Sequence, residues 1–263
     1  MARLRHTIVL APVGRQAAQA AVAQAHEVLE SLTPAPGPGG TLLAPDGRPV
    51  VDAELRSGEH LRPGARYRVA TGAEHAADAE VLAWDRGRET ALRVLVTDPE
   101  TGGRMVNSLR LRSADRPEHV TVTVDGGLVR PDGRRRRLRW MELRGQLDLP
   151  RWWGAAEGAP GHAALIVDVR LPVLRAEIRA TPHPGADGTW RVEVRTVLRG
   201  RGLARPVAAV PLRVTRRMLH RALGQALERG AHDWGTRVVP ELRRPPEEFR
   251  KRLLDELCAP RTG

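Results

Sequence analysis

Few side chains in this sequence could carry out chemistry on their own. Glu228 and His232 lie four residues apart on a predicted helix, with Asp233 beside them, so they could reach one metal ion. No third ligand is in view, and the same spacing is typical of a polar pair on a solvent-facing helix. The nine histidines form no metal-binding signature. We therefore predict no metal centre.

Acid–base chemistry has weak candidates. His162 follows Pro160-Gly161 and His183 lies in a predicted hairpin turn; either could act as a general base beside a pocket, with solvated loop residues as the favoured interpretation. Four other polar residues could form a pair inside a cavity: Arg93, Glu177, Glu193 and His220. Strand alternation from Trp190 points Glu193 outward, which argues against it. No catalytic residue is assigned, and enzyme activity stays open.

Absent residues exclude several enzyme classes. The sequence has no Gly-x-x-x-x-Gly-Lys-[Ser/Thr] loop and no Gly-x-Ser-x-Gly motif. Gly200-Arg-Gly202 starts a dinucleotide-binding pattern without its third glycine. Lys251 is the only lysine and Cys258 the only cysteine, so Schiff-base chemistry is nearly excluded and a disulfide framework is excluded. No cofactor is predicted.

The positive charge suggests an anionic partner, but composition weakens that argument. The net charge is +12, and because Lys251 is the only lysine, 42 of the 43 basic residues are arginine. Asn107, Tyr67 and Phe249 are each the only residue of their type. This bias is typical of a GC-rich bacterial genome. The charge attracts anions at low salt without identifying a nucleic-acid-binding protein.

The densest basic run is the basis of the alternative function. Arg134, Arg135, Arg136, Arg137 and Arg139 precede Trp140, and together they could hold phosphates and stack on a base. A solvated hairpin beside Pro131-Asp-Gly133 is the favoured interpretation. Trp152-Trp153 is predicted to lie in a loop, Pro150–Gly161, as a contact surface or a plug of a sheet's open end. Nucleic-acid binding is therefore not favoured.

The elements that would position these residues alternate between helices and short strands. A strand through Leu10 and a helix over Gly14–Leu32 are followed by a flexible connection, Thr33–Gly40, and by strands from Thr41 to Leu149. A hairpin, Leu165–Ala180 and Thr189–Leu198, leads through the bend Arg199–Pro206 to an amphipathic helix over Thr215–Arg237. A last helix, Glu247–Leu257, has Phe249, Leu253 and Leu257 on one face.

Several motifs in this order resemble the START-like superfamily, also called SRPBCC or polyketide cyclase/dehydrase-like. They are Gly64-Ala-Arg-Tyr-Arg68, the strand and turn Ala79–Arg88, Gly188-Thr-Trp-Arg-Val-Glu-Val194, Gly200-Arg-Gly202, Arg205-Pro206 and the long helix after them. The resemblance implies a helix-grip fold with an apolar cavity between sheet and C-terminal helix. Family members use such a cavity for lipids or polyketides, sometimes for cyclisation or dehydration.

The chain departs from this family in two respects. It has extra strands around Val106–Leu149 and a C-terminal extension, and its first helix stands alone where the family usually has two. The family has no fixed catalytic motif to transfer. The resemblance therefore implies a fold and a binding cavity, and it implies no mechanism.

We predict an α+β fold in which a curved antiparallel sheet grips a long C-terminal helix. Residues 1–240 form one domain, with 33–40 as a flexible connection, and 241–263 form a helical extension whose 247–257 segment could dock a protein partner. The predicted function is binding of a hydrophobic small molecule. The predicted location is the cytoplasm, because no signal peptide or membrane span is recognised. The predicted ligand-binding residues are Tyr67, Trp84, Trp190, Leu219, Leu223, Leu227 and Trp234.

Overall fold

The structure is a computed structural model that describes residues 1–36, 40–70, 76–97, 103–128, 138–200 and 216–259. The chain divides into two compact units, each made of two stretches of sequence. Unit 1 comprises Met1–Arg15 and Trp140–Arg243, and unit 2 comprises Gln16–Arg139 and Arg244–Gly263. The single domain over 1–240 stays a prediction.

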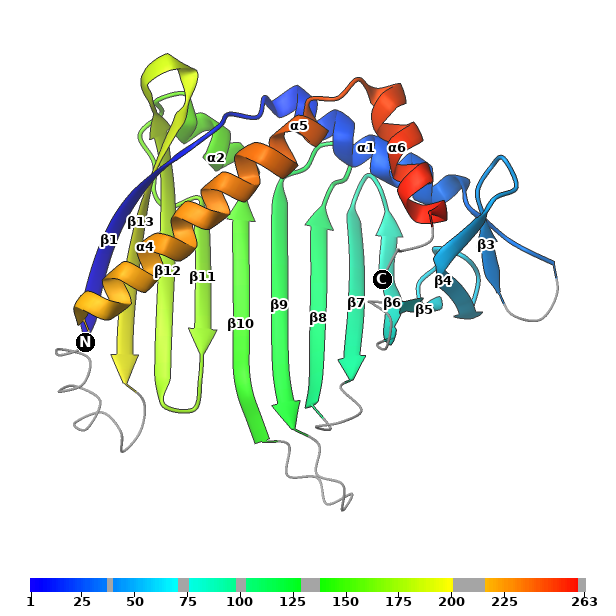
Figure 1. Cartoon of the computed structure of the whole chain (residues 1–263), viewed down its shortest axis with the longest axis horizontal. Helices are drawn as coiled ribbons and strands as arrows, with labels where there is room; N and C mark the ends of the chain where they lie inside the picture. The colour runs from blue at the N-terminus through cyan, green and yellow to red at the C-terminus, as the bar shows by residue number, and fades with distance from the viewer. Residues whose placement is uncertain (37–39, 71–75, 98–102, 129–137, 201–215, 260–263) are drawn as a thin grey trace. The chain divides into compact units, whose positions relative to one another are not determined.

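Unit 1 is built on antiparallel strands in the order β1-β13-β12-β11-β10. Their bounds are β1 Ala2–Leu10, β10 Leu138–Asp148, β11 Leu165–Arg170, β12 Leu174–Pro184 and β13 Trp190–Gly200. Its helical segments are α2 Leu149–Ala156, η1 Ala186–Gly188, α4 Arg216–Asp233, η2 Trp234–Val238 and α5 Val239–Leu242. Figure 1 shows α4 on one face of these strands, beside β1.

Unit 2 holds the antiparallel strands β9-β8-β7-β6-β5-β4-β3-β2, in that order. Their bounds are β2 Thr33–Pro34, β3 Thr41–Leu43, β4 Pro49–Ser57, β5 Arg66–Ala70, β6 Ala76–Asp85, β7 Glu89–Thr97, β8 Gly103–Arg112 and β9 His119–Leu128. Two helices accompany them: α1 Arg15–Ser31, which begins at the last residue of unit 1, and α6 Pro246–Cys258.

A buried cluster forms the core of unit 2. Its members come from the end of α1 and from β3 to β6: Leu32, Leu42, Ala44, Val50, Ala65, Tyr67 and Val81. The helix α1 buries Ala21, His26 and Val28, and the α6 residues Leu254, Leu257 and Cys258 pack against the cluster. This packing uses part of the apolar face of α6. Docking of a partner through 247–257 stays a prediction.

The structure confirms antiparallel strands combined with helices and corrects three local predictions. Leu165–Ala180 is two strands, because the chain turns at Leu171, where the backbone N–H of Leu171 donates to the carbonyl oxygen of Leu174. Trp152 and Trp153 lie in α2 and not in a loop. Asp148 caps this helix by accepting from the backbone N–H of Arg151, and Pro150 fits its first turn.

The third correction concerns the connection at 33–40, where Thr33–Pro34 forms a short strand that pairs with β3. Residues 37–39 of this connection lie outside the described residues. The bend Arg199–Pro206 falls largely within the undescribed stretch 201–215, which also includes Thr215, the first residue of the predicted long helix.

Candidate ligand-binding face of unit 1

The inner face of unit 1, defined as the sheet face on which α4 lies, is almost entirely apolar. Cross-strand register brings one residue from each strand into each of three rows. The rows are His6-Val194-Ala180-Leu165-Leu147, Leu4-Thr196-Ile178-Val167-Gly145 and Ala2-Leu198-Ala176-Val169-Leu143. Only His6 and Thr196 are polar among these residues.

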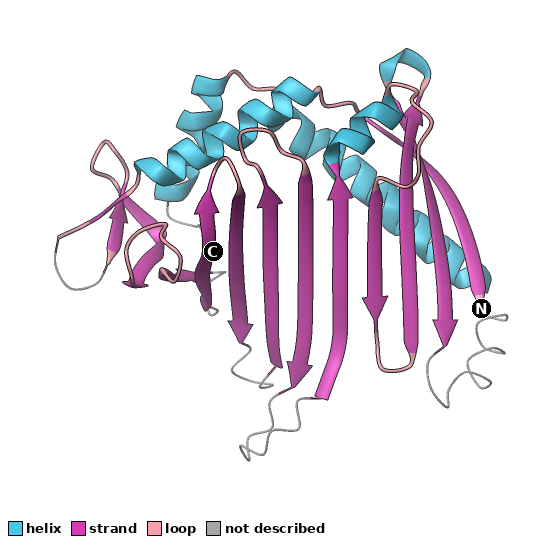
Figure 2. Cartoon of the chain, turned by 180° about the vertical axis from the view of Figure 1, so that it is seen from behind, coloured by secondary structure: helices cyan, strands magenta, loops and turns pink. Residues whose placement is uncertain are grey.

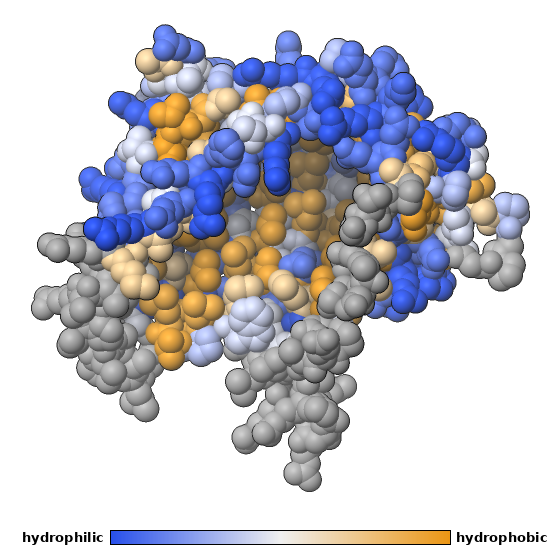
Figure 3. All heavy atoms as spheres, viewed as in Figure 1, coloured by the Kyte–Doolittle hydropathy of each residue, from blue (hydrophilic) through white to orange (hydrophobic). Residues whose placement is uncertain are grey.

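Burial on the inner face falls from β13 towards β10. The β13 residues Val192, Val194 and Leu198 are buried, whereas Val167 on β11 and Leu143 on β10 are half-buried. Figure 3 shows hydrophobic side chains on the surface below α4. The half-buried part of the face therefore presents aliphatic surface that the described helices leave partly uncovered.

The helix α4 packs along β1 at the edge of the sheet. Leu223 packs against Ala2, Leu4 and Leu198. Further along, a Cβ added to Gly224 would lie 3.2 Å from the His6 ring, so glycine permits the close approach of helix and strand. At the C-terminal end of α4, the Trp234 indole donates a hydrogen bond of 2.9 Å to the carbonyl oxygen of Ala11. The helix is thus held to β1 and the segment that follows it.

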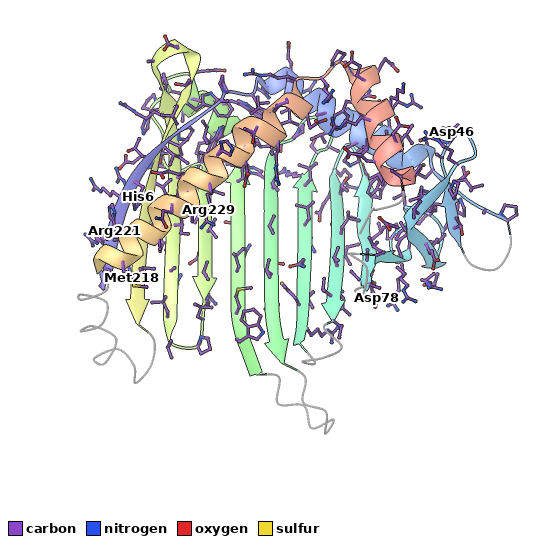
Figure 4. The ribbon with its side chains drawn as sticks, in the orientation of Figure 1. His6, Asp46, Asp78, Met218, Arg221 and Arg229 are labelled. Carbon is purple, nitrogen blue, oxygen red and sulfur yellow. The ribbon has the colours of Figure 1, made fainter. Side chains whose placement is uncertain are left out.

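His6 lies at the junction of β1 and α4 (Figure 4), with its ring centroid 4.0 Å from that of His220. Its Nε2 atom is buried and has no hydrogen-bond partner among the described residues. Burial lowers the pKa of His6, the nearby His220 lowers it further, and Glu228 opposes the shift. The neutral imidazole is therefore favoured.

Thr196 is the second polar residue of the inner face. It is 3% exposed, and its hydroxyl has no hydrogen-bond partner among the described residues. Register pairs Thr196 with Leu4, two residues from His6 on β1, so the two polar residues are diagonal neighbours on one face. A buried polar group without a partner is costly. Both atoms are therefore candidates for a hydrogen bond to a group from outside the described residues.

Comparison with known proteins assigns no family to this chain. No protein-family model matches it, and no curated protein does so. Among solved structures, the crystal structure of DynU16, a protein of the dynemicin biosynthetic locus, is similar at 14% sequence identity. The match covers 77% of this chain and 87% of that chain with a TM-score of 0.20. A similarity this weak supports no argument about function.

Two predicted ligand-binding residues lie in unit 2 and have structural bonds there. The Tyr67 hydroxyl accepts from the backbone N–H of Leu61 and bonds His60 Nδ1. Burial raises the pKa of Tyr67, and the Leu61 hydrogen bond opposes this shift. The Trp84 indole donates to Glu30 of α1 and its ring lies 4.9 Å from that of His26. Tyr67 therefore links β5 to the turn at His60 and Leu61, and Trp84 links β6 to α1.

The other predicted residues belong to unit 1. Trp190 is buried at the start of β13, with its ring edge-to-face against Trp152 at 5.9 Å. Leu223 and Leu227 are half-buried on α4, while the Leu219 side chain lies outside the described residues. The sequence pattern did not single out His6 and Thr196. A signal was nevertheless present in the sequence. His6 and Thr196 occupy positions on β1 and β13 where strand alternation predicts an inward-facing apolar residue.

The basic run is largely outside the described residues, which exclude Arg134–Arg137 and the side chain of Arg139. Trp140 is 39% exposed on β10. Among the remaining candidates, Arg93 pairs with Glu80, Glu177 with Arg179, and Glu193 with Arg195. His220 is the candidate that the structure places beside His6, with ring centroids 4.0 Å apart.

The described residues contain no group of three or more His, Cys, Asp or Glu side chains placed to hold a metal ion. Glu228 and His232, the pair with metal-ligand spacing, are both exposed on α4. None of the helices in the described part of the chain is long and apolar enough to cross a membrane.

Proposed function

We propose that unit 1 binds a hydrophobic small molecule, of the lipid or polyketide type, on its inner face beside α4. The observation that carries the proposal is the partial exposure of aliphatic side chains on β11 and β10 within an inward-facing, apolar surface. Apolar surface of this kind gains free energy when a ligand removes it from water. In this proposal α4 grips the ligand against the sheet.

His6 and Thr196 would supply the polar contacts of this site. A neutral imidazole and a hydroxyl can each donate or accept a hydrogen bond, so a ligand hydroxyl or carbonyl oxygen suits both. The expected ligand is therefore a hydrophobic molecule that carries a hydroxyl or carbonyl oxygen. Nothing in this arrangement requires that the ligand react.

Two adjacent residues of β11 provide a matched test. Val167 faces inward in register with Ile178 and Gly145, whereas Ile166 faces outward between Arg179 and Gln146, and both are half-buried. We expect cis-parinaric acid to bind the wild type and Ile166→Asp with similar Kd in a fluorescence titration. Val167→Asp should raise the Kd at least tenfold, because a carboxylate opposes apolar binding.

Native mass spectrometry of the protein as isolated supplies a second readout, in which a bound molecule should be present in the wild type and reduced in Val167→Asp. Circular dichroism and thermal melting check that both variants fold. No binding of cis-parinaric acid to the wild type, or an equal loss in the two variants, would overturn the proposal.

A further inference from the structure

Arginines lie directly opposite one another on the outward face of unit 1, the sheet face opposite the inner face. Arg5 on β1 pairs in register with Arg195 on β13, which pairs with Arg179 on β12. A second row, four residues along, consists of Arg199, Arg175 and Arg170 on β13, β12 and β11. Each row therefore places three positive side chains on three adjacent strands.

Folding alone gives no reason for these rows, because like charges directly opposite each other in a sheet are destabilising. Intervening acids relieve part of the repulsion: Arg195 pairs with Glu193, Arg179 with Glu177, and Arg175 with Asp168. These acids also hold the guanidinium groups in place. The side chains of Arg179 and Arg195 remain 58% and 57% exposed.

The charge balance of this face is positive. Beyond the two rows, register places Arg3, Arg144 and Arg191 on the same side of the sheet. The nine arginines outnumber the five acids at outward positions of these strands, Glu142, Asp148, Asp168, Glu177 and Glu193. In Figure 2 no described helix covers this side of β11, β12 and β13. The face is therefore open to a large anionic partner.

The spacing of the rows suits an extended polyanion. Neighbouring strands lie about 4.8 Å apart, so one row spans roughly 10 Å, and four residues along a strand separate the rows by about 13 Å. Anionic membranes are a poorer match, because the apolar residues at outward positions of β1, β12 and β13 are only valines. Trp140, 39% exposed at an outward position of β10, is a single aromatic residue beside the arginines.

We propose that the outward face of unit 1 binds the phosphate backbone of a nucleic acid. Recognition is through charge and does not select bases, since guanidinium groups bind phosphate oxygens in paired hydrogen bonds. The proposal does not use the run Arg134–Arg137, which lies outside the described residues. The outward face lies on the opposite side of the sheet from the proposed ligand-binding face, so either proposal can fail without the other.

The test uses a fluorescent, mixed-sequence single-stranded 20-mer DNA and measures anisotropy from 50 to 300 mM NaCl. The row variant carries Arg5→Gln, Arg179→Gln and Arg195→Gln. The control variant removes the same charge from unit 2 through Arg56→Gln, Arg62→Gln and Arg66→Gln, which replace exposed, ion-paired arginines. A lysine version of the row variant keeps the charge.

We expect the row variant to bind at least tenfold more weakly at 100 mM NaCl. The slope of log K against log salt should fall by about 2, since each phosphate contact to a single strand contributes about 0.7. The control variant should stay within twofold of the wild type, and the lysine variant should recover most of the affinity. Thermal melting of the row variant should show at most a small change, because the removed repulsion offsets the loss of the exposed pairs Glu177–Arg179 and Glu193–Arg195.

Equal loss in the row and control variants would overturn the proposal, because net charge would then explain binding. Binding to phosphatidylserine vesicles without binding to DNA would overturn it in favour of a membrane surface. A duplex of the same sequence serves as a further probe, and binding to either form supports the proposal. Unchanged binding of cis-parinaric acid in the row variant shows that the inner face is intact.

Discussion

His26 of unit 2 and His6 of unit 1 differ in their hydrogen bonds. In unit 2, His26 is 7% exposed and uses both ring nitrogens, with Nδ1 bonded to the Val22 carbonyl oxygen and Nε2 to the Thr90 hydroxyl. In unit 1, His6 Nε2 and the Thr196 hydroxyl are buried without partners among the described residues. The hydrogen bonds of His26 are typical of a group with a structural role.

Apolar packing shows the same contrast. The residues of unit 2 that pack with α1 form a continuous buried cluster. In unit 1 the described cluster at α4 is Ala2, Leu4 and Leu198, with Leu223 packed against it at the edge. A sheet face that is filled by its own helices contributes stability, whereas one that is partly filled retains apolar surface for a ligand. Under the proposed function, the partly filled face of unit 1 would be the binding surface, while the filled face of unit 2 contributes stability.

The largest expected effect comes from truncating one leucine in each unit. Leu42 is 3% exposed in the unit 2 cluster, and Leu42→Ala should lower the unfolding free energy by about 2–5 kcal/mol in urea titrations. Leu143 is half-buried on the inner face of unit 1, so Leu143→Ala should cost roughly 1 kcal/mol while weakening cis-parinaric acid binding. Similar losses of unfolding free energy in Leu42→Ala and Leu143→Ala would contradict the contrast between the two units.

A pair of threonines tests the polar contrast. Thr90→Val should cost about 1–3 kcal/mol, because it leaves buried His26 Nε2 without its partner at 2.9 Å. Thr196→Val should be neutral or stabilising in the unliganded protein, since it replaces an unpartnered hydroxyl with a methyl group of similar size.

Urea unfolding measures both threonine variants, and cis-parinaric acid titration shows whether Thr196 contributes to binding. A loss of stability in Thr196→Val as large as that in Thr90→Val would give the two hydroxyls the same structural role. The proposed difference between the hydrogen-bonded interior of unit 2 and the ligand-binding face of unit 1 would then be wrong.

Local sequence patterns predicted most elements. Ala18, Val22, Ala25 and Leu29 predicted α1, and alternation predicted β8 and β9, because helix and strand periods are local properties. The pattern missed the break at Leu171–Val173, where Pro172 interrupts what reads as one strand. It also missed α2, since the Trp-Trp pair between prolines and glycines outweighed the capping signal of Asp148.

The candidate site was less predictable because it depends on register between distant strands. Leu223, one of the predicted ligand-binding residues, packs against β1 and β13, and its contact with a ligand stays a prediction. The sequence could not show that Tyr67 and Trp84 belong to unit 2, or that His6 meets His220. A periodic pattern identifies which side of an element is apolar, but the partner across the interface is set by tertiary pairing.

The smallest expected effect is a pH dependence confined to the β1–α4 junction. Burial and His220 lower the pKa of His6 below 6.5, whereas His6 of the unfolded chain titrates near its ordinary value. As pH falls below 6.5, His6 is protonated in the unfolded chain before it is protonated in the folded protein, so the unfolding free energy decreases. Above this range His6 is neutral in both states and the effect vanishes. Urea unfolding at about pH 7.5 and about pH 5.5 should show a smaller acid loss in His6→Gln than in the wild type. His162→Gln, at an exposed position, should match the wild type, and an unchanged acid loss in His6→Gln would exclude His6 as the source.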